Sequence, residues 1–492
     1  MRRPFRRLGM AVTVLVVALL LNFTWVQVVR SSALRADPNN TRSQLDEATR
    51  ARGQITAAGG VVLARSQPSN DSSKYQRIYP GGAAYLPITG YYSSLYGATG
   101  IEKSENSLLS GNDDALIGGQ LSDLITGRDP RGGNVELTVV PAVQQAAYQA
   151  LSSAGFAGAV VAIKPSTGEI LALASTPTYD PTPLASHFTQ VQRNESDIIN
   201  NSAPSVRLNR ATGAVYPPGS TFKLVLGGAA LQRGYTPTSK LTGLAKISLP
   251  GGGTLSNFQG ESCAGNGGAD VTMTHALALS CNTAFARLGI ALGAEPIRAQ
   301  AAALGVNPDG FSVGIDVVGS RLGTLADPQA LAQSSIGQRD VAFTPMQNAI
   351  VAATIANHGV RMAPYLVART TAPDLSVIST SKPQVAEAAA MPTAVADDLR
   401  TMMVQSEKDT PGSGSIADLV IASKTGTAEH GTDPKQTPPH CWYVAFAPAD
   451  NPQVAVAVLV ENGGNGDLGA TGGKVAGPIG RQVIAAALSG GR

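Results

Sequence analysis

The pair of residues best suited to chemistry in this sequence is a serine and a lysine three positions apart, Ser220 and Lys223. Prolines and a glycine precede the pair and an apolar helical pattern follows it, which predicts a helix N-terminus at Ser220. Because positions i and i+3 share a helix face, we expect the Lys223 amine beside the Ser220 hydroxyl, where a neutral lysine can act as its base. Backbone N–H groups at the helix end could stabilise an oxyanion. The alternative for this pair alone is a capping serine with an incidental lysine.

A second short motif supplies a further hydroxyl and an amide. Ser280 and Asn282 lie 57 and 59 residues after Lys223, at the end of a helical stretch predicted over residues 274–279. The serine could relay a proton, and the asparagine could hold a substrate amide. Taken alone, such a tripeptide is most often an ordinary loop.

A third motif, Lys424-Thr425-Gly426-Thr427, follows an apolar strand predicted over residues 419–422. The edge of a strand can pair with an extended peptide substrate. The lysine and the threonines would then meet a carboxylate, and the glycine removes a side chain that would block the approach. This motif is also weak alone, so the argument rests on the three motifs together.

In this order, S-x-x-K, S-x-N and K-T-G-T resemble the three motifs of the penicillin-recognising serine transferases. With its apolar N-terminal run and the segment after it, the chain resembles a class B penicillin-binding protein. In its small size it resembles the short class B proteins of actinobacteria. We expect no bifunctional class A enzyme, because no segment ahead of the non-catalytic pedestal domain, expected over residues 30–135, is large enough for a glycosyltransferase. Outside the three motifs, the resemblance is carried by Arg52-Gly53-Gln54-Ile55, Arg77, Tyr79-Pro80, Gly100-Ile101-Glu102, Leu137-Thr138-Val139 with Gln144, Gly168-Glu169-Ile170-Leu171-Ala172, Gly337-Gln338, Thr344-Pro345 and Ala356-Asn357.

The resemblance implies a peptidoglycan D,D-transpeptidase that works without a metal or an organic cofactor. Ser220 would attack the penultimate carbonyl of a D-Ala-D-Ala stem peptide, and an amine of a neighbouring stem peptide would convert the acyl-enzyme into a cross-link. β-Lactams would acylate the same serine, and backbone N–H groups of Ser220 and Thr427 would form the oxyanion hole. The implied catalytic residues are Ser220, Lys223, Ser280 and Lys424, and the implied substrate-binding residues are Asn282, Thr425, Gly426 and Thr427.

Two other functions stay open on the sequence alone. Water could replace the acceptor amine, which would make the protein a D,D-carboxypeptidase or a β-lactamase-like hydrolase. The other alternative is a non-catalytic, membrane-anchored scaffold or penicillin sensor, and the intact catalytic residues argue against it. The N-terminal apolar run and the segment that follows it favour the transpeptidase.

The elements that must position these residues are predicted from the apolar patterns. Strands are expected at residues 135–140, 159–163, 170–174, 419–422, 442–447 and 454–461, and helices at 143–151, 221–232, 274–292, 345–357, 392–406 and 475–488. Residues 52–135 are rich in Gly, Ser, Tyr and Asn, and we expect an irregular, strand-poor segment there. This order predicts a mixed α/β (α+β) fold. The resemblance implies the penicillin-binding transpeptidase fold, with a central antiparallel sheet flanked by helices, an all-helical lobe and an elongated N-terminal pedestal.

Residues 8–29 form an uncharged, mostly apolar run that is long enough, as a helix, to cross a bilayer. Four arginines precede it and one follows, so we expect a single-pass protein with a cytoplasmic N-terminus and an extracytoplasmic catalytic domain at the cell membrane. The alternative is a cleaved signal peptide, although the run is longer than the usual signal core. We expect a cytoplasmic tail (1–7), a transmembrane anchor (8–29), a non-catalytic pedestal or dimerisation-like domain (30–135) and a transpeptidase domain (136–492).

The N-terminal region also accounts for the formal net charge of +3. Residues 1–30 hold five of the 37 basic residues and no acid, which leaves 32 basic against 34 acidic residues in the rest. This balance removes the support for nucleic-acid binding. The expected partners are peptidoglycan stem peptides, β-lactams, the membrane through the N-terminal helix and, as the resemblance implies, a multi-spanning glycosyltransferase.

Three cysteines lie in the part expected outside the cytoplasm, where thiols tend to oxidise. Cys263 and Cys281 could pair over the entrance of the cleft or stay free, and Cys441 is expected as a buried thiol. The five histidines show no metal-binding spacing with cysteines or acids, so no metal site is expected.

Overall fold

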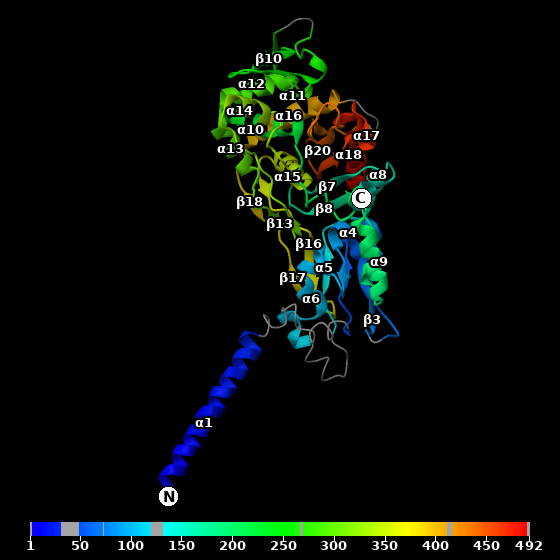
Figure 1. Cartoon of the computed structure of the whole chain (residues 1–492). Coiled ribbons are helices and arrows are strands. Elements are labelled where there is room, and N and C mark those ends of the chain that lie inside the picture. Colours follow the sequence, from blue (N-terminus) through cyan, green and yellow to red (C-terminus); the bar gives the residue numbers. More distant parts are fainter. Residues whose placement is uncertain are drawn as a thin grey trace.

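The computed structural model describes residues 2–30, 49–71, 73–119, 131–265, 269–410 and 416–489. Two sheets organise the chain beyond the N-terminal helix α1 (Arg2–Thr24). We call the six-stranded sheet and the elements packed on it the pedestal, and the five-stranded sheet with its helices the catalytic body. Figure 1 shows α1, the pedestal and the catalytic body following one another along the long axis of the molecule.

A five-stranded antiparallel sheet forms the centre of the catalytic body, in the order β19-β20-β21-β7-β8. Its strands are β7 (Gly158–Ile163), β8 (Ile170–Thr176), β19 (Ala422–Ala428), β20 (His440–Ala447) and β21 (Val454–Val460). Helices α8 (Pro141–Ser152) and α18 (Gly472–Ser489) cover one face, and α15 (Pro345–Ala356) packs on the other. Every residue of β7, β20 and β21 is therefore buried, which explains their almost unbroken apolar sequences. The expected central antiparallel sheet flanked by helices is confirmed.

The lobe beside this sheet is mainly helical, but it is not all-helical as we expected, and Figure 1 shows it at the end of the molecule away from α1. It contains α10 (Lys223–Gln232), α11 (Met273–Ala278), α12 (Asn282–Leu292), α13 (Ala294–Ala303), α14 (Pro328–Ser334) and α16 (Thr393–Lys408). It also carries two small sheets, which pair β9 (Lys240–Thr242) with β12 (Asp270–Thr272) and β10 (Lys246–Ser248) with β11 (Thr254–Ser256).

The single helix predicted over residues 274–292 is wrong, because the structure divides it into α11 and α12. Between them Ser280 has a φ of +60°, a left-handed conformation that a continuing helix does not allow. The apolar spacing runs through the break, so periodicity alone predicts one helix.

The pedestal contains a six-stranded sheet, so the expectation of a strand-poor segment over residues 52–135 is wrong. The strand order is β17-β16-β6-β1-β2-β3, with β1 (Ile55–Thr56), β2 (Val62–Pro68), β3 (Tyr75–Ile78), β6 (Asn134–Leu137), β16 (Val367–Thr371) and β17 (Val377–Thr380). Strands β16 and β17 come from the range that we assigned to the transpeptidase domain; β16 pairs with β6 of the pedestal, and β17 pairs with β16. The pedestal is therefore closed by a segment far along the chain.

Short helices and one longer helix pack on the pedestal sheet or lie next to it. They are α4 (Leu86–Thr89), α5 (Gly100–Ser104), α6 (Asn106–Ser110) and α9 (Thr189–Asn200). Ser93 donates a 2.5 Å hydrogen bond to Gln192 of α9. This contact holds α9 against the pedestal, although the helix follows β8 of the catalytic body in sequence.

A buried carboxylate between two arginines holds the centre of the pedestal together. Glu102 is fully buried, and its oxygens lie 2.5 Å from Arg52 Nε and 2.7 Å from Arg77 Nε. Burial raises the pKa of the Glu102 carboxyl, but the two guanidinium groups outweigh it and hold the pKa below its ordinary value. These three residues belong to the three short motifs that carried the family resemblance in this region.

The N-terminal helix is exposed along its described length. Residues 7–27 are long enough and apolar enough to cross a membrane, and they form the one candidate span among the described residues. The helix continues from α1 into a π-helical turn at Trp25–Val29. This agrees with the apolar run on which we based a membrane anchor.

Candidate active site

The nucleophile candidate stands on a tight turn that leads into a buried helix. Gly219–Phe222 forms one 3₁₀ turn directly before α10, so Ser220 lies at a helix N-terminus as predicted. The indole N–H of Trp442 donates a 2.9 Å hydrogen bond to Pro217 O, and Gly219 N donates one of 2.9 Å to Gly337 O. These two contacts fix the turn from both sides.

Lys223 lies beneath Ser220 and is fully buried. Its Nζ is 2.9 Å from Ser220 Oγ, 2.7 Å from Ser280 O, 2.8 Å from Asn282 Oδ1 and 3.2 Å from Ser280 Oγ. Burial, and then the charge of Lys424, lower the pKa of the Lys223 amine well below its ordinary value. No carboxylate lies among these partners, so nothing there favours the charged form strongly enough to reverse the shift.

Ser280 connects the two lysines through its hydroxyl. Its Oγ lies 3.2 Å from Lys223 Nζ and 3.0 Å from Lys424 Nζ, and Lys424 Nζ also donates to Thr425 O at 2.9 Å. Burial lowers the pKa of Lys424 to about 7. The left-handed backbone of Ser280 places its hydroxyl and its carbonyl oxygen together in the site, a strained arrangement of the kind that clusters at functional sites.

The third motif lies inside strand β19, and not after a strand as we predicted. Its residues pair in register with β20, for example Lys424 with Val444 and Thr427 with Cys441. Lys424 and Gly426 are buried, whereas Thr425 and Thr427 are partly exposed, as expected for alternating side chains. Because β19 is the edge strand of its sheet, its second side is not paired within the sheet.

Gly426 makes room for the turn of the nucleophile. A Cβ at this position would lie 3.0 Å from Pro218 O, 3.0 Å from Thr221 Cγ2 and 3.1 Å from Trp442 Cβ. These distances are tighter than ordinary contacts, so a side chain here would push β19 away from the turn. Space for the turn therefore accounts for glycine, whereas the sequence argument had invoked space for a substrate.

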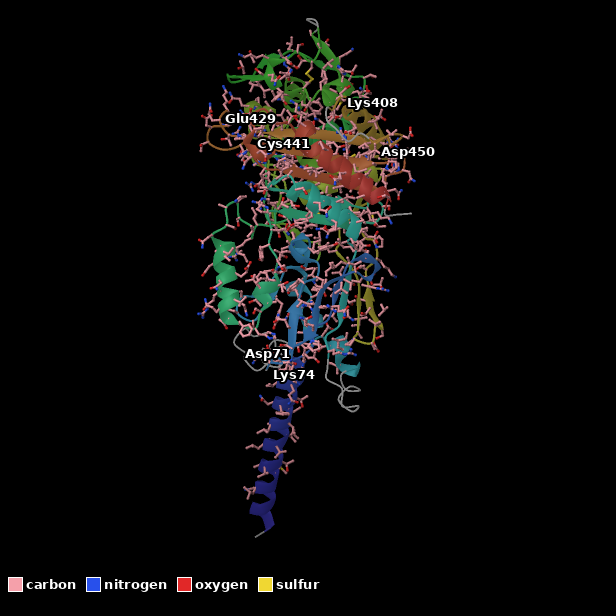
Figure 2. All side chains as sticks on the ribbon, turned by 90° about the vertical axis from the view of Figure 1, so that its right-hand side faces the viewer. Asp71, Lys74, Lys408, Glu429, Cys441 and Asp450 are labelled. Carbon is pink, nitrogen blue, oxygen red and sulfur yellow. A yellow bond between two sulfur atoms is a disulfide. The ribbon has the colours of Figure 1, made fainter. Side chains whose placement is uncertain are left out.

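A disulfide and a buried amide fix the loop before Asn282. Cys263 and Cys281 are bonded, which decides the alternative that the sequence left open (Figure 2). The side-chain oxygen of Asn257 accepts a 2.9 Å hydrogen bond from Thr283 N at the start of α12. The expected buried free thiol is also present, because Cys441 is unpaired and burial raises the pKa of its thiol to about 12.

Hydrogen bonds thus link five of the predicted residues in one site: Ser220, Lys223, Ser280, Asn282 and Lys424. Thr425, Gly426 and Thr427 share the strand of Lys424, and Thr427 Oγ1 accepts a 3.3 Å hydrogen bond from Gly472 N. Within the described part of the chain there is no group of three His, Cys, Asp or Glu side chains that could hold a metal ion.

Three groups that help to build this site had no role predicted from the sequence. Gly337 and Trp442 hold the turn, and the Phe285 ring lies 5.5 Å from Lys223 Nζ, measured to its centroid. Gly337 belongs to one of the motifs that carry the family resemblance, so the sequence did mark this position, although no role was predicted for it. Nothing in the spacing indicates Trp442 or Phe285, because both reach the site only through tertiary packing.

Comparison with known proteins identifies the class. The family described as "Penicillin binding protein transpeptidase domain" matches residues 158–485, and "Penicillin binding protein A dimerisation domain" matches residues 52–135. The chain therefore belongs to the penicillin-binding protein transpeptidases, and the predicted class B resemblance and transpeptidase fold are confirmed.

Individual relatives narrow the assignment within this family. The chain is 50% identical to the peptidoglycan D,D-transpeptidase PbpA of Mycolicibacterium smegmatis over 99% of both chains. It is 48% identical to the Mycobacterium tuberculosis PbpA over the full length of both. The solved ceftriaxone acyl-enzyme complex of M. tuberculosis penicillin-binding protein A matches with a TM-score of 0.88 and 48% identity, and covers 90% of this chain and 100% of that one.

Proposed function

We propose that this chain is a peptidoglycan D,D-transpeptidase that cross-links stem peptides through an acyl-enzyme on Ser220. The observation that carries the proposal is the 2.9 Å contact between Ser220 Oγ and Nζ of Lys223, a buried lysine whose pKa is lowered. A neutral amine at this distance can take the hydroxyl proton as the nucleophile attacks. The PbpA relatives that match over the whole chain carry the same activity in their names.

Acylation starts with the transfer of the Ser220 proton to Lys223. Ser220 Oγ attacks the penultimate carbonyl of the donor stem peptide, and a tetrahedral oxyanion forms. The carbon–nitrogen bond to the terminal D-Ala then breaks, and the departing amine needs a proton. Ser280 Oγ lies within hydrogen-bond distance of both lysines, so it can pass the proton from Lys223 towards the leaving group, with Lys424 on its other side.

Strand β19 and Asn282 would bind the donor peptide. The free side of an edge strand can pair with an extended peptide, and the partly exposed Thr425 and Thr427, with Lys424, would meet its terminal carboxylate. Asn282 would hold the peptide amide. The backbone N–H groups of Ser220 and Thr427 are the oxyanion donors that this pose requires.

Deacylation reverses the proton path with a different nucleophile. An amine from a neighbouring stem peptide attacks the ester carbonyl, a carbon–nitrogen bond forms, and the ester carbon–oxygen bond to Ser220 breaks. The proton from the amine returns to Ser220 through Lys223. A β-lactam enters the same first step, because Ser220 opens its ring and all of its atoms stay attached as an ester.

The same proposal includes location and partners. Helix α1 would anchor the chain in the cell membrane as a single span, with the N-terminus cytoplasmic and the catalytic body outside. There the site would meet peptidoglycan stem peptides. A multi-spanning glycosyltransferase, which would make the glycan strand, would contact the anchor and the pedestal. The predicted domain boundaries, 1–7, 8–29, 30–135 and 136–492, belong to this proposal as well.

An exchange assay separates the transpeptidase from the hydrolase. The full-length protein in detergent receives a synthetic pentapeptide that ends in D-Ala-D-Ala, together with a labelled D-amino acid as the acceptor amine. We expect the labelled amino acid to replace the terminal D-Ala, as followed by mass spectrometry. A product that ends in a free penultimate carboxylate, without label, would assign the protein to the carboxypeptidases instead.

A further inference from the structure

A short loop after α14 touches the segment that carries Ser220. Gly337 O accepts the 2.9 Å hydrogen bond from Gly219 N, directly before the nucleophile. Gly337 has a φ of +71°, and a Cβ there would lie 2.0 Å from Gly219 O. Glycine is therefore required, and the loop approaches the nucleophile turn backbone to backbone.

The next residue of this loop reaches the other half of the site. With its side-chain amide turned so that both of its polar atoms are satisfied, Gln338 donates from its nitrogen to Glu429 O and accepts at its oxygen from Glu429 N, both at 3.1 Å. Glu429, labelled in Figure 2, directly follows β19, in which Thr427 pairs with Cys441 of β20. Gln338 thus forms a pair of hydrogen bonds with the residue that directly follows the strand of Thr427.

The loop is itself held firmly at both ends. Gly337 N donates to Ser334 O at 2.9 Å, and Gln338 N donates to Gln333 O at 3.1 Å, so the loop closes on the end of α14. Further along, Phe343 exchanges two 2.9 Å backbone hydrogen bonds with Tyr216, four residues before the nucleophile. Hydrogen bonds of this loop therefore connect the nucleophile turn to the end of β19.

We propose that Gln338 is a positioning residue for acylation, which fixes the end of β19, and with it Thr427 N–H, relative to the turn of Ser220. The proposal rests on the proposed function, in which these two segments each supply one oxyanion donor. Such donors must lie about 2.7–3.1 Å from the oxyanion, so a small shift between the segments weakens the transition state. Gln338 acts through its two hydrogen bonds to the backbone of Glu429.

The first test removes the amide and measures acylation. In the full-length protein, we expect Gln338→Ala to lower the second-order rate of labelling by fluorescent penicillin about 10- to 100-fold, the scale of a misplaced reacting group. We expect the thermal unfolding midpoint to stay close to that of the wild type, because the side chain is half-buried in a loop. An unchanged labelling rate would overturn the proposal.

Gln144 provides a matched control at the opposite edge of the same sheet. Its amide makes the same two-way pairing with the backbone of Leu173 on β8, at 3.1 Å and 2.8 Å. We expect Gln144→Ala to lower the unfolding midpoint, because the side chain is fully buried, and to leave the labelling rate of the folded protein unchanged. An equal loss of rate in both variants would reduce Gln338 to a general structural role and overturn the proposal.

The second test replaces the amide by a group that pH can switch. In Gln338→Glu, an ionised carboxylate accepts from Glu429 N but cannot donate to Glu429 O, whereas the protonated acid can do both. We therefore expect the ratio of variant to wild-type labelling rates to rise as the pH falls from 7 towards the ordinary glutamate pKa of about 4.3. A ratio that is independent of pH would contradict the hydrogen-bond mechanism.

These results are distinguishable from a failure of the proposed function. If the wild type itself is not acylated on Ser220, the proposed function fails and this inference fails with it. If the wild type is acylated and Gln338→Ala is acylated equally fast, only the positioning role is wrong.

Discussion

Ser280 Oγ lies 3.2 Å from the amine of Lys223 and 3.0 Å from that of Lys424, so one hydroxyl connects two buried lysines. Both pKa values are lowered, that of Lys424 to about 7, because burial penalises the charged ammonium. Both lysines therefore lose their protons at a lower pH than an ordinary lysine. A neutral amine is the state that a base for Ser220 requires.

The pH dependence of acylation follows from these shifts. A lowered pKa means that the lysines lose their protons at a lower pH than an ordinary lysine, so the active neutral form is present well below the ordinary lysine pKa. We expect the second-order rate of penicillin acylation to reach its plateau below the ordinary lysine pKa and to fall as the pH decreases and the lysines become protonated. Stopped-flow measurement of acylation between pH 5 and pH 10 checks this. A rate that keeps rising up to the ordinary lysine pKa, about 10.4, would contradict the account.

At the scale of elements, the site is made by close packing of β19 against the 3₁₀ turn before α10. Gly426 allows this approach, because a Cβ there would lie 3.0 Å from both Pro218 O and Thr221 Cγ2. The indole of Trp442 holds the same turn from β20. The distance between the nucleophile and the substrate-binding strand is therefore set by backbone contacts as well as by catalytic side chains.

We expect Gly426→Ala to slow penicillin acylation about tenfold or more, because the added methyl group must move the turn by a few tenths of an ångström. The measurement is the labelling rate at equal amounts of folded protein. Gly477→Ala on α18 is the control, since a Cβ there has no neighbour closer than 3.7 Å, and it should label at the wild-type rate. Equal rates for all three proteins would show that the contact at Gly426 does not position the turn.

Local patterns predicted part of the site, and tertiary contacts supply the remainder. The i, i+3 spacing was enough to place Lys223 beside Ser220. The break at Ser280 was missed, because a left-handed residue inside an apolar periodic stretch leaves no mark in the spacing. The polar residues of β19 concealed a strand, because Lys424 is buried by its tertiary setting and not by an apolar sequence.

The same limit explains the larger errors in the predicted fold. The long strands β7, β8 and β21 are apolar on both faces and were placed within two residues of their observed ends. In the pedestal, β1 has two residues, and β16 reaches the sheet from far along the chain. Neither a two-residue strand nor a non-local pairing gives a periodic signal.

At the scale of the whole molecule, buried charge stabilises the pedestal while buried lysines serve the catalytic body. The carboxylate of Glu102 compensates the charges of Arg52 and Arg77 in the buried interior of the pedestal. If its charge is removed, two guanidinium groups remain buried without their partner. Substitutions can therefore perturb the pedestal and the catalytic body separately.

We expect Glu102→Gln to destabilise the pedestal by about 3–5 kcal/mol, the usual result of removing one partner from a buried ion pair. Thermal unfolding measures this loss, and protein that remains folded should still be labelled by penicillin at the wild-type rate. Glu295→Gln is the control, because its pair with Arg298 is exposed and contributes little. An unfolding midpoint for Glu102→Gln equal to that of the control would contradict the structural role of the buried carboxylate.

The central claim, an acyl-enzyme on Ser220, is tested most directly by mapping the penicillin adduct. The full-length protein is incubated with penicillin, digested and examined by mass spectrometry, beside the Ser220→Ala variant. The account predicts one adduct with the mass of the intact antibiotic on the peptide that contains Ser220, and no adduct on the variant. An adduct on another residue, or equal modification of Ser220→Ala, would contradict it.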